Sequence, residues 1–114
     1  MDFSEYQEEA SKTIPSKLSE DEIVNNAIYG LVGELGELVD IVKKVKFQDH
    51  PMTIEVVNHL RSELGDVLWY LSELSTGLGF PLQEVAQTNI YKLRKRYGEH
   101  FDSEKSQNRK EGDI

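Results

Sequence analysis

The chain contains the run Gly33-Glu34-Leu35-Gly36-Glu37-Leu38-Val39-Asp40, and a second acidic run follows at Ser62-Glu63-Leu64-Gly65-Asp66-Val67. Each run places two carboxylates three residues apart among apolar residues. On an α-helix, side chains with this spacing lie on the same face. Two such helices packed face to face would bring together the carboxylates of Glu34, Glu37, Glu63 and Asp66.

Four carboxylates that meet between two helices repel one another unless a cation neutralises them. Oxygen ligands suit hard ions such as Mg²⁺, Mn²⁺ or Ca²⁺ rather than zinc, so we expect Mg²⁺, with Mn²⁺ as a substitute. Glu34, Glu37 and Glu63 have no basic residue four positions later. This lack of local ion pairs favours a metal site over a solvated helix surface.

The composition limits the classes of partner. The net charge of −8 argues against a nucleic-acid surface, which requires basic residues. The chain has no cysteine, which excludes disulfides and thiolate sites. No signal-like segment and no apolar run of about 20 residues is present, so we expect a cytoplasmic protein without membrane contact.

The apolar spacing predicts an all-α fold of four to five helices, over residues 3–14, 20–45, 54–76 and 82–97. Ser19 and Thr53 are the expected N-caps of the two long helices. Residues 1–102 then form one domain. The polar segment 103–114 cannot pack alone, and we expect it to be disordered or to lie across another surface.

The long helices carry apolar stripes, which we expect to form the core. Their members are Ile28, Leu31, Leu35, Leu38, Val39 and Val42, followed by Val57, Leu60, Leu64, Val67, Leu68, Leu71 and Leu74. A chain this small and acidic is expected to complete its bundle as a homodimer or homotetramer.

Three glycines, Gly30, Gly33 and Gly36, recur within the first acidic helix. Each costs the helix about 1 kcal/mol relative to alanine, so their presence needs a reason. Either a neighbouring helix approaches closely, or a ligand needs clearance beside the carboxylates. Other polar residues are interpreted as surface or structural: Glu55, Glu73, His50, His59 and His100.

Three motifs together resemble a known family. They are Gly30-Leu31-Val32-Gly33-Glu34-Leu35-Gly36-Glu37, Glu63-Leu64-Gly65-Asp66-Val67-Leu68-Trp69-Tyr70, and the run from Asn89 to Tyr97. This pattern is similar to the MazG-like family of all-α nucleoside triphosphate pyrophosphohydrolases, in which Glu-x-x-Glu precedes Glu-x-x-Asp. Here 25 residues separate Glu37 from Glu63.

The resemblance implies hydrolysis of a (deoxy)nucleoside triphosphate to monophosphate and pyrophosphate, and a role in nucleotide-pool control. By the same analogy the four acids bind Mg²⁺, and Glu37 orients the attacking water as a base. The candidate substrate contacts are Lys44, Tyr70, Asn89, Lys92, Arg96 and Arg109. Tyr70 also fits a core position, and Lys92 and Arg96 also fit a solvated basic face.

Two alternatives remain open from the sequence. The first is a relative with a narrow substrate, of the dUTPase or phosphoribosyl-ATP pyrophosphohydrolase type. The second is a non-catalytic helical interaction module whose acids bind a structural metal or a basic partner.

Overall fold

The computed structural model describes residues 1–109 and residue 112. Within these residues the chain forms five helices and no strand: α1 (Phe3–Ser11), α2 (Glu20–Phe47), α3 (Ile54–Leu78), α4 (Leu82–Tyr97) and α5 (Ser103–Gln107). The predicted all-α fold of four to five helices is confirmed. Among the described residues, none of the helices combines the length and apolar character that crossing a bilayer requires.

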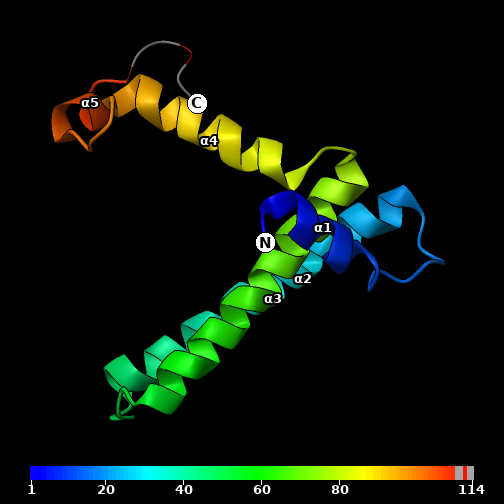
Figure 1. Ribbon diagram of the computed structural model, residues 1–114. Coiled ribbons are helices and arrows are strands. Elements are labelled where there is room, and N and C mark those ends of the chain that lie inside the picture. Colours follow the sequence, from blue (N-terminus) through cyan, green and yellow to red (C-terminus); the bar gives the residue numbers. More distant parts are fainter. Residues whose placement is uncertain (110–111, 113–114) are drawn as a thin grey trace.

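Helices α2 and α3 form a long antiparallel hairpin that is the centre of the structure (Figure 1). Both begin where the sequence predicts. Ser19 and Glu22 form a reciprocal capping box at the start of α2, and the Thr53 hydroxyl accepts a hydrogen bond from the Val56 N–H. Both run two residues further than expected, and α3 ends at Gly79 in the left-handed conformation (φ 84°).

Helix α1 packs against α3 and α4, close to the junction between them. The Gln7 amide group donates to the Thr76 hydroxyl (3.1 Å) and to the Phe80 carbonyl (3.2 Å), and its carbonyl accepts from the Leu82 N–H (2.7 Å). One side chain therefore fastens α1 to the end of α3 and caps the start of α4. Helix α1 ends at Ser11 rather than at residue 14, and residues 12–14 form a turn in which the Thr13 hydroxyl accepts a hydrogen bond from Nε1 of Trp69 on α3 (2.8 Å).

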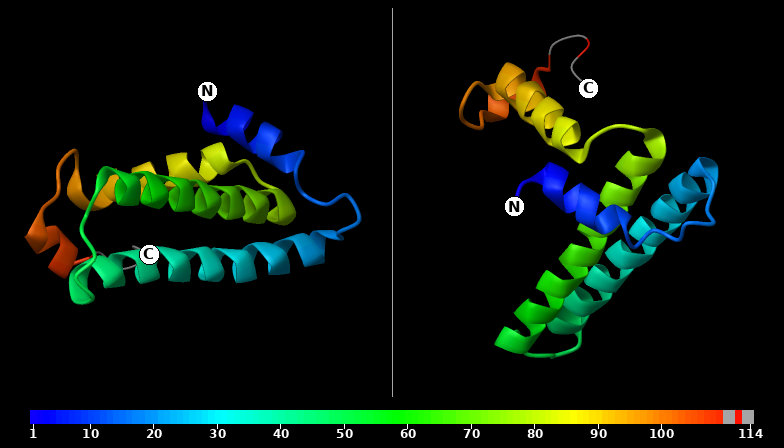
Figure 2. Two further views of the ribbon diagram at one scale, coloured as in Figure 1. Left: turned by 90° about the horizontal axis from the view of Figure 1, so that it is seen from below. Right: turned by 45° about the vertical axis from the view of Figure 1, so that its right-hand side comes forward.

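Helix α4 leaves the hairpin at an angle, as Figure 1 and the right-hand view of Figure 2 show. It contacts α1, α3 and α5, but within the described chain it does not contact α2. The segment 103–114, predicted to be disordered or to lie across another surface, begins with α5, which contacts α4 and is capped by the Asp102 carboxylate; residues 110–111 and 113–114 lie outside the described residues. The rings of Tyr97 and Phe101 contact each other in a tilted arrangement at the bend between α4 and α5, with centroids 5.1 Å apart.

One copy of the chain buries little apolar surface. Of the described residues, Ala27 and Leu82 are the only apolar ones classed as buried. The predicted core stripes are therefore wrong for a single chain, because the hairpin covers only one face of each helix. Side chains of both stripes remain exposed, among them Ile28, Leu35, Val39, Val42, Val57, Leu64 and Leu71.

Candidate metal and substrate site

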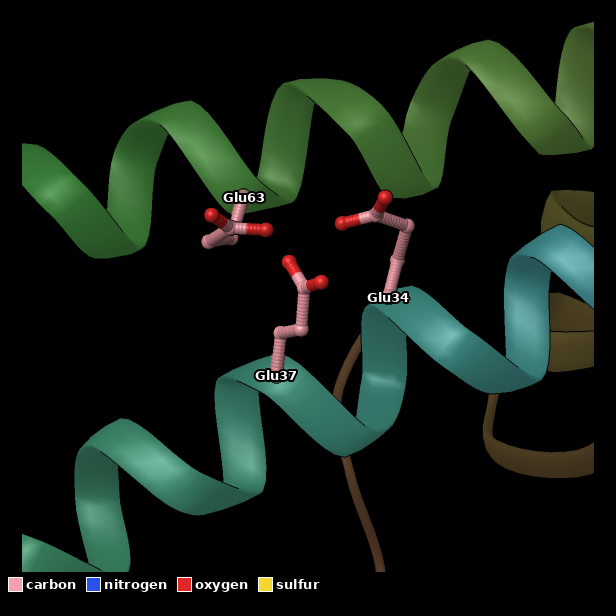
Figure 3. A group of neighbouring side chains, drawn as sticks. All are labelled: Glu34, Glu37 and Glu63. Carbon is pink, nitrogen blue, oxygen red and sulfur yellow. The ribbon is translucent and has the colours of Figure 1, made fainter.

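Three glutamates meet between the two long helices. Glu34 and Glu37 extend from α2 and Glu63 from α3, and all three side chains point into the space between the helices (Figure 3). One carboxylate oxygen of each lies within 4.8 Å of the others. The structure therefore brings together three of the four predicted metal ligands.

The fourth predicted ligand, Asp66, lies beside this group but outside it. Its side chain is exposed, and its carboxylate does not share the 4.8 Å grouping. Its charge nevertheless contributes to raising the pKa values of Glu34 and Glu37. Asp66 is thus an electrostatic neighbour of the cluster on α3.

Two carboxylate oxygens of the cluster lack partners. With the three glutamates ionised, Oε2 of Glu34 and Oε2 of Glu63 are both buried, and neither has a hydrogen-bond donor among the described residues. Glu63 is only 9 % exposed, whereas Glu37 is exposed to solvent. Buried oxygens without a donor are costly, and a hard divalent cation would satisfy them. The donor set and the orphaned oxygens therefore fit Mg²⁺ or Mn²⁺.

The carboxylates perturb one another strongly. A hydrogen bond shared with Glu63, together with partial burial and the charges of Glu37 and Asp66, raises the pKa of Glu34 to about 7. The pKa of Glu37 is also raised, first by its hydrogen bond with Glu63. The pKa of Glu63 is lowered, because Glu34 and Glu37 hydrogen-bond to it. Without a cation, repulsion between the carboxylates is relieved because Glu34 and Glu37 retain protons to higher pH than usual.

Stability should therefore depend on pH when metal is removed. Glu34 has an ordinary pKa of 4.5 and a folded-state pKa of about 7, so between these values the folded chain binds more protons than the unfolded chain. Stability then falls as pH rises through this interval. Acids with lowered pKa values, such as Glu63 and Asp40, change stability only below their ordinary pKa values, where stability is lost as pH falls. We expect the melting temperature in EDTA to fall from about pH 4.5 to pH 7.

Thermal unfolding followed by circular dichroism at several pH values measures this dependence. Saturating Mg²⁺ or Mn²⁺ should remove the fall, and Glu34→Gln in EDTA should flatten it. A melting temperature that rises throughout the interval in EDTA would contradict the coupling described for Glu34.

The glycines of α2 have two different roles. A Cβ atom at Gly30 would collide with the ring of Tyr70, whereas Cβ atoms at Gly33 and Gly36 would meet no atom within 4 Å. Close approach thus explains Gly30, and open space beside the carboxylates explains Gly33 and Gly36. Tyr70 packs in the hairpin next to the acids, and its pKa is raised by burial and then by the charges of Glu34 and Glu73.

A matched pair of substitutions tests this difference. Gly30→Ala should destabilise the fold by about 1–3 kcal/mol, since the methyl group must displace the Tyr70 ring. Gly33→Ala should be neutral or stabilise by up to about 1 kcal/mol, because alanine favours the helix and the space is open. Urea unfolding measures both. Equal changes in the two variants would contradict the assignment.

A groove of about 400 Å³ borders the carboxylate cluster. Gly33, Gly36, Asp40 and His59 line it together with cluster residues. His59 was interpreted from the sequence as structural or surface, yet its Nε2 lies 3.2 Å from Oε1 of Glu63. The signal that was available is its position one helical turn before Glu63, on the same face of α3.

The predicted substrate contacts are spread over the chain. Lys44 pairs with Asp40 at 2.9 Å on α2, one turn beyond the groove. Asn89 and Lys92 line a separate groove on α4, of about 420 Å³, and the Arg96 guanidinium lies 5.6 Å from the Tyr97 ring centroid. Arg109 follows α5 and is exposed. Tyr70 alone among the predicted contacts lies in the hairpin beside the acids.

Glu73, which the sequence suggested was a surface residue, is only 1 % exposed. The Asn26 side-chain amide donates to both of its carboxylate oxygens, at 2.9 and 3.2 Å. The reason is register: Glu73 lies three residues after Tyr70, on the face of α3 that packs against α2. The surface interpretation was therefore wrong.

The fold and the cluster define a class: an all-α hairpin with converging glutamates suited to a divalent cation. Comparison with known families makes this specific. Residues 24–101 match the MazG nucleotide pyrophosphohydrolase domain, so the chain belongs to that family. Members of this family generally depend on a divalent metal.

One similar protein is the Gene 37 protein of Mycobacterium phage L5, which is 44 % identical over 68 residues. The match covers 59 % of this chain and 60 % of the phage protein. The chain thus spans about three fifths of the length of this relative, whose name describes no activity. No solved structure matches the chain.

Proposed function

We propose that the protein hydrolyses (deoxy)nucleoside triphosphates to monophosphate and pyrophosphate with Mg²⁺, and thereby helps to control nucleotide pools. The observation that carries this proposal is the glutamate cluster with two buried, unpartnered oxygens. Its presence in a chain of the MazG nucleotide pyrophosphohydrolase family supports a nucleotide substrate.

The four acids would bind the metal, and one of them would also accept a proton. Glu34, Glu37 and Glu63 would hold Mg²⁺, and the exposed side chain of Asp66 would turn toward the ion as a fourth ligand. When bound, Mg²⁺ neutralises phosphate charge and lowers the pKa of a bound water. Glu37 is the exposed member of the cluster and lines the groove, so it is placed to accept a proton from an attacking water.

Phosphate and base contacts would come from more than one chain. Asn89, Lys92 and Arg96 lie on α4, and α4 does not contact the helix that carries Glu34 and Glu37. We propose that these residues, with Arg109, serve the site of a neighbouring subunit, and that Lys44 and Tyr70 serve their own.

The dimensions of one chain support a homodimer or homotetramer. Its accessible surface is 8592 Å², whereas a compact protein of this mass exposes about 6,400 Å². Its Cα radius of gyration is 17.4 Å, against about 13 Å for a compact domain of this length. The difference in area exceeds the ~800 Å² that each partner contributes to a standard interface.

A second copy of the chain would cover an exposed apolar face of α2. Ile28, Val32, Leu35, Val39 and Val42 are separated by three or four residues and are all exposed, so they form one apolar stripe along the helix. Val39 follows Glu37 by two residues, which places it about 200° around the helix from that acid. The stripe is thus separate from the carboxylate cluster.

The reaction can be tested by incubating the purified protein with each common NTP and dNTP and Mg²⁺, followed by chromatography of the products. Monophosphate and pyrophosphate, lost in EDTA, would support the proposal. Orthophosphate with a diphosphate would contradict it, because a different bond would have been cleaved. Turnover of dUTP alone would indicate the narrow-substrate alternative, and no turnover by folded, metal-loaded protein would favour a binding module.

A further inference from the structure

We propose that His59 is a positioning residue for Glu63, holding one carboxylate oxygen so that the other is presented to the metal. The inference rests on the proposed metal site and adds to it a residue outside the acidic motifs. His59 and Glu63 lie one turn apart on α3, and the imidazole forms one wall of the groove beside the cluster.

The two oxygens of Glu63 have different surroundings. Oε1 lies 3.2 Å from Nε2 of His59, whereas Oε2 is buried and, with the glutamates ionised, has no donor in the described part of the chain. The imidazole therefore engages one oxygen from the solvent side and leaves the other facing the cluster. The side chain of Glu63 is 12 % exposed and that of His59 is 59 % exposed, so the histidine reaches inward from the surface.

Such a contact has a consequence for metal binding. A carboxylate that is free to rotate must be ordered when it binds an ion, and a fixed hydrogen bond removes that cost in advance. Substituting the outer hydrogen-bond partner of a metal ligand usually weakens metal affinity by about 10–100-fold. A surface ion pair with no such role would leave metal affinity unchanged, since exposed pairs contribute little.

The imidazole could instead act on the metal through charge, and the direction of the effect separates the two roles. A positively charged side chain next to the site would repel the ion, so its removal would tighten metal binding. A positioning donor has the opposite effect, because its removal leaves Glu63 less ordered and weakens binding.

The test measures Mn²⁺ affinity by electron paramagnetic resonance titration of the full chain, at one fixed pH and without nucleotide. Three variants place different groups at this position. His59→Ala removes the donor, His59→Gln places an amide N–H near the position of Nε2, and His59→Asn places it near Nδ1, too short to reach Glu63. His100→Ala, a change of the same kind at an exposed position beyond α4, is the control.

We expect His59→Ala and His59→Asn to weaken Mn²⁺ binding by about 10–100-fold, and His59→Gln to restore most of the affinity. Unchanged or tighter binding in His59→Ala would overturn the inference, as would failure of His59→Gln to differ from His59→Asn. Circular dichroism of each variant confirms that the helices are retained.

Failure of the underlying proposal looks different. Glu63→Gln identifies the site, because it removes a carboxylate of the cluster itself. If the unaltered chain bound no Mn²⁺, or if Glu63→Gln left the affinity unchanged, the metal site and the role of His59 would both be overturned. If Glu63→Gln abolished binding while His59→Ala did not weaken it, only the role of His59 would be overturned.

Discussion

Replacing Glu37 with glutamine is expected to lower kcat by about 10²–10⁴-fold, the usual contribution of a general base. Glutamine keeps the shape of the side chain but cannot accept the proton or neutralise a cation. The fold should persist, because Glu37 is exposed and its removal relieves repulsion within the cluster. The variant therefore separates a chemical role from a structural one.

The measurement is steady-state release of pyrophosphate, with the melting temperature recorded in parallel. Glu55→Gln is the matched control, since it removes one exposed acid at the start of α3, away from the cluster. Retention of more than about a tenth of the activity by Glu37→Gln would show that Glu37 is not the base.

Val39→Glu is expected to break the assembly of subunits, the second large effect. Val39 is 64 % exposed in one chain, so the substitution should not disturb the hairpin itself. In an interface, however, an unpaired carboxylate would be removed from water, at a cost of about 3–5 kcal/mol. The dissociation constant should therefore rise by two or more orders of magnitude.

Sedimentation equilibrium of both proteins over a range of concentrations gives the two dissociation constants. Ser16→Glu adds the same charge at an exposed position between α1 and α2, outside the stripe, and should leave the association unchanged. If the unaltered protein were a monomer at all concentrations, or if Val39→Glu associated equally well, the α2 stripe would not be the subunit interface.

The parts of the structure that depend on local chemistry were predictable. The caps at Ser19 and Thr53 satisfy backbone N–H groups within a few residues, so short motifs were sufficient to locate the starts of α2 and α3. Convergence of Glu34, Glu37 and Glu63 followed from helical spacing and one assumption, that the two acidic faces meet. The position of Asp66 outside the group required knowledge of the actual helix packing.

Features that depend on packing were missed for a common reason. The burial of Glu73 is decided by Asn26, which is 47 residues away in sequence. The contact of His59 with Glu63 is different, because the two residues lie one turn apart on α3 and their spacing was visible in the sequence. Apolar spacing likewise located the apolar positions of both helices, but it did not distinguish the face that packs within the hairpin from the face that a single chain leaves exposed.

The hydrogen bond between Asn26 and the buried carboxylate of Glu73 fixes how α2 and α3 are aligned along their length. Apolar side chains repeat along both long helices, so hydrophobic contact alone would tolerate a sliding of α2 past α3 by one turn, about 5.4 Å. A polar pair at such an interface penalises every slipped alignment, because each would leave the buried carboxylate of Glu73 without its donor. The same displacement would separate Glu34 and Glu37 from Glu63. The hydrogen bond between Asn26 and Glu73 thus keeps the glutamates of the cluster opposite one another, although it lies several helical turns away from them.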